Sequence, residues 1–213
     1  MTRLPNGKKL LRGMPPDTPT KTTMRLLGLL GPLLICLAVA GSCLVNQAGA
    51  ETYTRTIERY KIPDVTLINQ DGARIGLKKM FSCNKPVFVD FVYTTCTTIC
   101  PVLSVNFANF QKQIDVESGK ALLVSISIDP EFDTPKEMKS YLKRYRAKPG
   151  WEFLTGSRED IDQVLKAFNV FTLNKMNHLP VMLLKSPSDE KWVRIYGLIN
   201  AEKLLVEYEK VRY

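Results

Sequence analysis

The sequence predicts an α/β fold, in which helices flank a central mixed sheet, preceded by one N-terminal transmembrane helix. Two observations support this prediction. Strands of the buried type alternate with amphipathic helices after residue 60, and twenty residues without a charge come before them at residues 26–45. The chain has 213 residues, of which 45% are hydrophobic and 24% charged, and these values exclude a disordered or fibrous protein.

The segment at residues 26–45 is long enough to cross a bilayer. At about 1.5 Å of rise per residue it spans roughly 30 Å, the thickness of the hydrocarbon core. Six of the seven charged residues before it are basic, which predicts that this end stays in the cytoplasm. We therefore expect a basic cytoplasmic tail at 1–25, a membrane anchor at 26–45, a linker at 46–59 and an exported domain at 60–213.

Two other fates of the apolar segment stay open. Ala48-Gly49-Ala50 forms a small-residue site after which a signal peptidase can cut. Alternatively, the residues that end in Cys43 form a loose lipoprotein box, with lipid attached to that cysteine. The domain that follows is exported in each case.

The net charge of +9 does not indicate a nucleic-acid partner. More than half of the excess lies in residues 1–25, which carry a net charge of +5. The rest of the chain has no basic stripe interleaved with aromatic residues. We expect no nucleic-acid binding.

Local signals define the elements of the exported part. Asp71-Gly72 predicts a hairpin turn, and three capped starts predict helices, at Thr134 with Pro135 and Glu137, at Ser157 with Asp160, and at Asn200. The expected strands are residues 86–93, 121–129, 151–155, 179–187 and 191–197, and the expected helices are 98–116, 135–146, 158–168 and 201–213. This order, with paired cysteines after the first core strand, matches a thioredoxin-like layout.

Cys96 and Cys100 are the two cysteines that indicate chemistry. They lie where a buried strand passes into a helix that we expect to begin near Thr97 or Thr98. Backbone N–H groups at a helix start favour thiolates. Paired thiolates exchange with disulfides and bind soft metals such as Cu(I), and a static disulfide is the structural alternative. We interpret Cys83, in a turn-rich connector, as a partly shielded loop cysteine.

His178 is the single histidine of the chain and comes just before the strand that starts at Pro180. In a thioredoxin-like sheet this loop faces the cysteine loop, so Cys96, Cys100 and His178 are expected to converge. Two thiolates and an imidazole suit Cu(I), can hold Cu(II) with an added weak ligand, and also suit zinc. Pro180 is either a cis-proline opposite the cysteines or a trans-proline that begins a strand.

Acidic residues gather after the strand that ends near residue 129. Helix capping accounts for Asp133 and Thr134 without chemistry. Asp129 can tune the thiols if its loop lies near Cys96, although a purely structural role is the simpler interpretation.

The chain resembles the Sco/SenC family of membrane-anchored copper chaperones over roughly residues 60–210. The resemblance rests on Thr95-Cys96-x-x-x-Cys100-Pro101, on SISIDPEFDTP at 125–135, on LTGSREDIDQVLKAFNV at 154–170, and on the position of His178. It implies a thioredoxin-like fold and copper, as Cu(I) or Cu(II), bound by Cys96, Cys100 and His178.

The resemblance also implies a role in cytochrome c oxidase assembly, where copper is delivered to the CuA site or the cysteines of that site are reduced. The expected partners are a copper-accepting oxidase subunit or another copper enzyme, and a protein that reduces the thiols. The expected location is the inner membrane with the domain in the periplasm, or the mitochondrial intermembrane space in a eukaryote. We expect a carrier and not an enzyme. The alternative is a thiol–disulfide oxidoreductase, or a redox-signalling protein, that acts on partner cysteines through Cys96 and Cys100.

Overall fold

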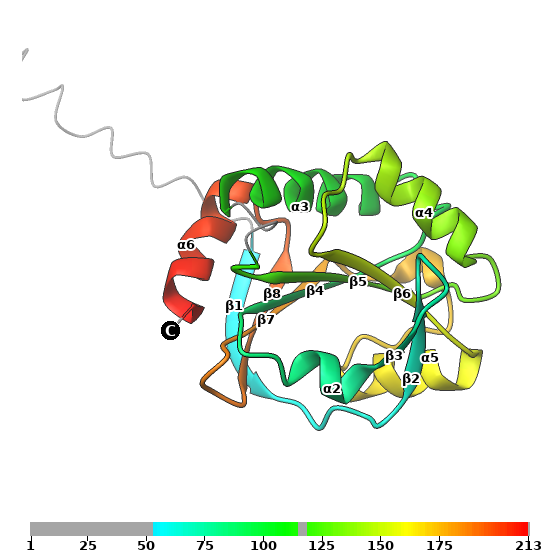
Figure 1. Ribbon diagram of the computed structural model, residues 1–213, viewed down its shortest axis with the longest axis horizontal. Helices are drawn as coiled ribbons and strands as arrows, with labels where there is room; N and C mark the ends of the chain where they lie inside the picture. Colours follow the sequence, from blue (N-terminus) through cyan, green and yellow to red (C-terminus); the bar gives the residue numbers. More distant parts are fainter. Residues whose placement is uncertain (1–52, 115–118, 213) are drawn as a thin grey trace, which may run out of the picture. The chain divides into compact units, whose positions relative to one another are not determined.

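The computed structural model describes residues 53–114 and 119–212 (Figure 1). The strands in these residues are β1 (Tyr53–Arg59), β2 (Thr66–Asn69), β3 (Arg74–Gly76), β4 (Val87–Val92), β5 (Leu122–Ser127), β6 (Trp151–Thr155), β7 (Val181–Lys185) and β8 (Lys191–Gly197). The helices are α2 (Leu77–Phe81), α3 (Cys100–Ile114), α4 (Pro135–Arg144), α5 (Arg158–Ala167) and α6 (Ala201–Val211), with a 3-10 turn, η2 (Lys175–Asn177).

The strands form one sheet in the order β1-β8-β7-β4-β5-β6-β2-β3. β5 pairs in parallel with β4 and with β6, whereas β7 pairs with β4 in the antiparallel direction. The predicted mixed sheet is therefore confirmed. Every residue of β4 is buried, as expected for a central strand covered on both faces.

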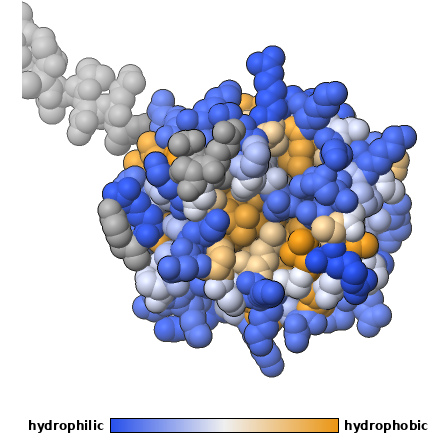
Figure 2. Space-filling view, viewed as in Figure 1, coloured by the Kyte–Doolittle hydropathy of each residue, from blue (hydrophilic) through white to orange (hydrophobic). Residues whose placement is uncertain are grey.

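Helices cover both faces of this sheet. Figure 1 shows α3 and α4 on one face and α2 and α5 on the other, and α6 packs beside α3. Figure 2 shows hydrophobic residues in the middle of the same view with hydrophilic residues around them. The layers place the carboxyl end of β4 and the start of α3 next to each other, at the edge where the two cysteines lie.

Most predicted boundaries agree with the structure. The hairpin turns at Gly72, which has φ of +80°, and the predicted caps hold their helices. Thr134 accepts the Glu137 N–H, Ser157 accepts the Asp160 N–H, and Asn200 accepts the Lys203 N–H.

Three elements differ from the sequence prediction. Residues 53–59, expected to be part of the linker, form β1 and pair with β8 along their whole length. The five residues of α2 were not predicted, because one turn of helix shows no periodicity. α3 begins at Cys100 instead of at Thr97 or Thr98, which leaves Cys96 in the loop before it.

No helix within residues 53–114 and 119–212 is long and apolar enough to span a membrane. The expected tail, anchor and cleavage or lipidation sites, which include Cys43 and Ala50, lie outside the described residues.

Candidate metal centre

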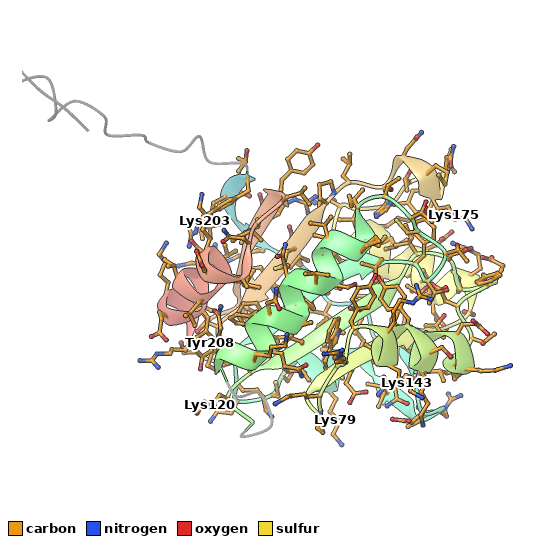
Figure 3. All side chains as sticks on the ribbon, turned by 90° about the horizontal axis from the view of Figure 1, so that it is seen from above. Lys79, Lys120, Lys143, Lys175, Lys203 and Tyr208 are labelled. Carbon is orange, nitrogen blue, oxygen red and sulfur yellow. The ribbon has the colours of Figure 1, made fainter. Side chains whose placement is uncertain are left out.

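The structure brings Cys96, Cys100 and His178 together. Cys96 lies in the loop after β4, Cys100 is the first residue of α3, and His178 directly follows η2. Their two Sγ atoms and one imidazole nitrogen all lie within 4.8 Å of one another, and all three residues are buried. Figure 3 shows the neighbouring Lys175 near the beginning of α3, and Lys120 near the other end of that helix.

Cys96 is positioned as a thiolate. The Cys100 backbone N–H, at the start of α3, donates to Cys96 Sγ at 3.4 Å, and the Thr98 hydroxyl lies 3.6 Å from the same sulfur. Burial alone would raise the pKa of this thiol, but hydrogen bonds from Cys100 and Thr98 outweigh it and lower the pKa to about 7. The N–H at the start of α3 therefore contributes to the lowered pKa of Cys96, after the Cys100 side chain and together with Thr98.

Cys100 behaves in the opposite way. Burial, followed by the interaction with Cys96, raises its pKa far above the usual range of a thiol. The prediction that both cysteines are favoured as thiolates is therefore wrong for Cys100. The physical reason is that burial of its side chain, followed by the hydrogen bond with Cys96, outweighs the backbone hydrogen bond from Tyr93 to its sulfur. Of the two cysteines, Cys96 is therefore the one that ionises more readily.

The tautomer of His178 follows from its hydrogen bonds. Nδ1 lies 3.0 Å from the carbonyl oxygen of Lys175, which can only accept, so Nδ1 carries the proton. Nε2 therefore has a free lone pair, and it lies 3.4 Å from Cys100 Sγ. Burial lowers the pKa of His178 and keeps the ring neutral. A neutral imidazole with its other nitrogen held by a carbonyl is the usual state of a metal ligand.

Tyr93 and Met176 also belong to this site, although the sequence did not single them out. The ring of Tyr93 packs edge-on against His178, with 5.4 Å between centroids, and its hydroxyl donates to Met176 Sδ at 3.3 Å. Burial, followed by the charge of Cys96 and a hydrogen bond with it, raises the pKa of Tyr93 to about 12. The sequence contains one indication of this role, since Tyr93 comes just before the cysteine loop and Met176 comes two residues before His178.

Asp133 has a different role from the one predicted. It is fully buried and is not a helix cap, since its carboxylate accepts from the Thr94 N–H at 3.0 Å, from the Thr94 hydroxyl at 2.5 Å and from the Ser127 hydroxyl at 2.5 Å. It ties the cysteine loop to the end of β5. Asp129 pairs with Lys175 and so reaches the turn that carries His178.

The backbone and the thiols decide two of the alternatives that the sequence left open. The peptide bond before Pro180 is trans, because the described residues contain no cis peptide bond. Cys83, Cys96 and Cys100, the cysteines of the described residues, are all free, so a static disulfide is not present. Cys83 is half-buried and donates to the Lys85 carbonyl, which agrees with a shielded loop cysteine.

The donor set fits one soft metal ion. Bonds from a transition metal to sulfur or nitrogen are about 2.0–2.3 Å long, so three donors within 4.8 Å of one another can surround a single ion. Two sulfurs favour Cu(I) or zinc over hard cations such as magnesium. The same pair can exchange with a disulfide, with Cys96 as the attacking thiolate. That the three residues bind metal stays a prediction.

Comparison with known proteins identifies related chains. Residues 55–200 match the model of the SCO1/SenC family. The SCO1 protein homolog of Bacillus subtilis (strain 168) is 34% identical over 112 residues, which cover 51% of this chain and 57% of that protein. The chain spans about half the length of the curated relatives it matches.

Solved structures share the fold. BsSco is a member of the Sco family of cytochrome c oxidase assembly proteins in which a disulfide switch was identified. It has a TM-score of 0.60 at 27% identity, over 74% of this chain and 96% of that one. ScoI of Arabidopsis thaliana, solved with copper bound, has a TM-score of 0.56 at 30% identity, over 68% and 95%. These similarities confirm the predicted thioredoxin-like fold.

Proposed function

Because the chain belongs to the SCO1/SenC family, we propose that it is a membrane-anchored copper carrier that acts during cytochrome c oxidase assembly. Copper is its cargo, bound by Cys96, Cys100 and His178. The observation that carries the proposal is the convergence of two sulfurs and one imidazole nitrogen within 4.8 Å. The copper-bound Arabidopsis relative and the assembly role of BsSco support the choice of metal and of process.

Each residue has a distinct part in copper binding. Cys96 supplies a thiolate near neutral pH, because its pKa is about 7. Cys100 loses its proton when the metal binds, since a cation replaces the proton as the partner of the sulfur. His178 supplies the Nε2 lone pair and selects the geometry and oxidation state of the ion. The hydrogen bond from Nδ1 of His178 to the Lys175 carbonyl keeps Nε2 pointed at Cys100.

We propose that the acceptor is the CuA-bearing subunit of the oxidase or another copper enzyme, and that copper passes to it by ligand exchange. A separate thiol reductant keeps Cys96 and Cys100 reduced. The protein acts as a carrier and not as an enzyme. Residues 26–45 hold the carrier in the inner membrane, with the domain in the periplasm or, in a eukaryote, in the intermembrane space. Extraction of membranes with alkaline carbonate tests this anchor, because an integral protein stays in the pellet.

The low pKa of Cys96 also supports a second function, the reduction of disulfides in a partner. Cys96 would attack the partner disulfide, one partner sulfur would leave as a thiolate, and Cys100 would resolve the mixed disulfide. A Cys100→Ser variant would then trap the mixed disulfide. The two functions are compatible, since the same thiols must be reduced before they take up copper.

The deciding experiment titrates the reduced full chain, solubilised in detergent under anaerobic conditions, with copper in each oxidation state. We expect one copper ion per chain and, with Cu(II), a sulfur-to-copper charge-transfer band. Copper binding and the charge-transfer band should be weakened or lost in Cys96→Ser, and the band should be lost in His178→Ala. Absence of specific copper binding, together with rapid thiol–disulfide exchange, would assign the protein to the reductase class instead.

A further inference from the structure

The three proposed copper ligands are buried, which raises the question of how the cargo leaves. Cys96 is 5% exposed, Cys100 is 0% and His178 is 9%. Ligand exchange requires an incoming donor to approach the ion before the old bonds break. A further soft donor at the rim of the site would stabilise copper at that stage.

Met176 is at this rim. It is 64% exposed and lies two residues before His178, in the same 3-10 turn. Its sulfur is not randomly placed, because the Tyr93 hydroxyl donates to it at 3.3 Å. The ring of Tyr93 packs edge-on against His178, with 5.4 Å between centroids. One tyrosine side chain therefore connects the thioether to a proposed ligand, His178.

The turn that carries Met176 is also fixed. The Asn174 side chain accepts the Met176 backbone N–H at 2.9 Å. Lys175 pairs with Asp129 and lies over the ring of Tyr93, with 5.3 Å between its Nζ and the ring centroid. The backbone is therefore held on both sides of Met176, while the side chain keeps three rotatable bonds that can swing its sulfur toward the thiols.

From these contacts, and building on the proposed function, we propose that Met176 is a further copper ligand that binds Cu(I) through its thioether at the exposed side of the site. A thioether is neutral and soft, so it favours Cu(I) over Cu(II) and binds without releasing a proton. One of its sulfur lone pairs accepts from Tyr93, and the second is available to the ion. In transfer, Met176 holds Cu(I) while a donor of the acceptor replaces one of the buried ligands, and the oxidation state does not change.

Exposure alone would fit a different role, since Leu173 and Leu179 on the same segment are also exposed, at 95% and 55%. An apolar surface for partner docking needs the volume of Met176 but not its sulfur. Met176→Leu separates the two roles, because leucine keeps the size and apolar character and lacks the sulfur.

Selenium provides the direct test. The full chain, labelled with selenomethionine and loaded with one equivalent of Cu(I) in detergent, is measured by X-ray absorption at the copper and selenium edges. We expect a Cu–Se contribution at bonding distance in the unsubstituted chain and its loss in Met176→Leu, which keeps the other six of the seven methionines. Cu(I) affinity, measured by competition, should fall about tenfold in Met176→Leu with Cu(II) affinity unchanged.

Met80→Leu is the matched control, because Met80 lies on α2, on the face of the sheet opposite to α3 (Figure 1). It should leave the Cu–Se signal and the Cu(I) affinity unchanged. Copper bound through sulfur with no Cu–Se contribution would overturn the role of Met176 and leave the proposed function in place. Absence of bound copper would overturn both.

Discussion

Cys100 Sγ lies 3.4 Å from Nε2 of His178, although 78 residues separate them along the chain. The contact joins the first residue of α3 to the turn before β7, and both elements adjoin the buried strand β4. The thiol proton of Cys100 can therefore point at a neutral imidazole. A soft cation that replaced this proton would meet a sulfur and a nitrogen already in place, with little rearrangement of the chain.

His178→Ala should separate the two oxidation states of copper. Two sulfurs remain in the variant, so most Cu(I) affinity should persist, whereas Cu(II) affinity should fall by about 10–100-fold because the nitrogen donor is lost. Competition titrations with each ion measure this difference. Asn177→Ala, at the exposed neighbouring residue, is the control and should change neither affinity. An equal loss of both ions would contradict the assigned role of His178.

Cys96 should ionise near neutral pH while Cys100 stays a thiol. The pKa of Cys96 is lowered to about 7, so its thiolate is present above that pH and is lost as the pH falls through it. Titration of the ultraviolet absorbance of the thiolate, as the difference between the metal-free reduced protein and its Cys96→Ser variant, measures the midpoint. We expect a midpoint near pH 7. A midpoint near 8.5, where a free thiol titrates, would mean that α3 does not stabilise the thiolate.

The meeting of Cys96, Cys100 and His178 could be predicted from the sequence, because strong local signals place each of them at the end of an element. The strand before Cys96 is apolar except for Asp90, and Pro180 marks the start of the strand after His178. The opposite pKa shifts of the two cysteines could not be predicted. They depend on how deeply each sulfur is buried and on which sulfur accepts the N–H at the start of α3, and α3 starts two or three residues later than its sequence suggested.

β1 and Asp133 show two further limits of sequence reasoning. Four consecutive side chains of β1 are exposed, so its sequence shows no alternation of apolar and polar residues. The strand is recognised only from its backbone pairing with β8. Asp133 stands one residue before a helix cap, which made capping the natural interpretation. Its actual partners, Thr94 and Ser127, belong to other elements and are recognisable only in the folded chain.

Asp133→Ala should destabilise the fold and loosen the cysteine loop. The substitution leaves the Thr94 N–H, the Thr94 hydroxyl and the Ser127 hydroxyl without their buried acceptor, and we expect a loss of about 3 kcal/mol. Urea unfolding of residues 51–213, which form a compact unit of their own, measures it. The loosened loop should also broaden the Cu(II) spectrum of the variant.

Thr134→Ala is the control for this loss, since it removes only a helix cap, the acceptor of the Glu137 N–H. It should cost about 1 kcal/mol and leave the copper spectrum unchanged. If Asp133→Ala cost no more than this control, the carboxylate would not be what holds the cysteine loop to β5.

Asp90→Asn should change how stability depends on pH. Asp90 is fully buried on β4, and in the described residues its carboxylate oxygens have no hydrogen-bond partner at normal geometry. Burial raises its pKa to about 7, more than the neighbouring Ser125 hydroxyl offsets. Between about pH 4 and pH 7 the folded state therefore holds a proton that the unfolded state releases, so this residue lowers stability as the pH rises.

The stability lost through Asp90 across this window is at most about 4 kcal/mol, since each pKa unit corresponds to about 1.4 kcal/mol. Urea unfolding at several pH values gives the free energy of unfolding of the metal-free protein and of Asp90→Asn. The difference between the two at each pH is the contribution of Asp90. The variant should gain stability relative to the unsubstituted protein as the pH rises from 4 to 7, with no further gain above. If the difference in unfolding free energy did not depend on pH, Asp90 would have the same pKa in the folded and unfolded states. The buried carboxylate would then be ionised throughout this pH range. Burial without a partner makes that outcome unfavourable.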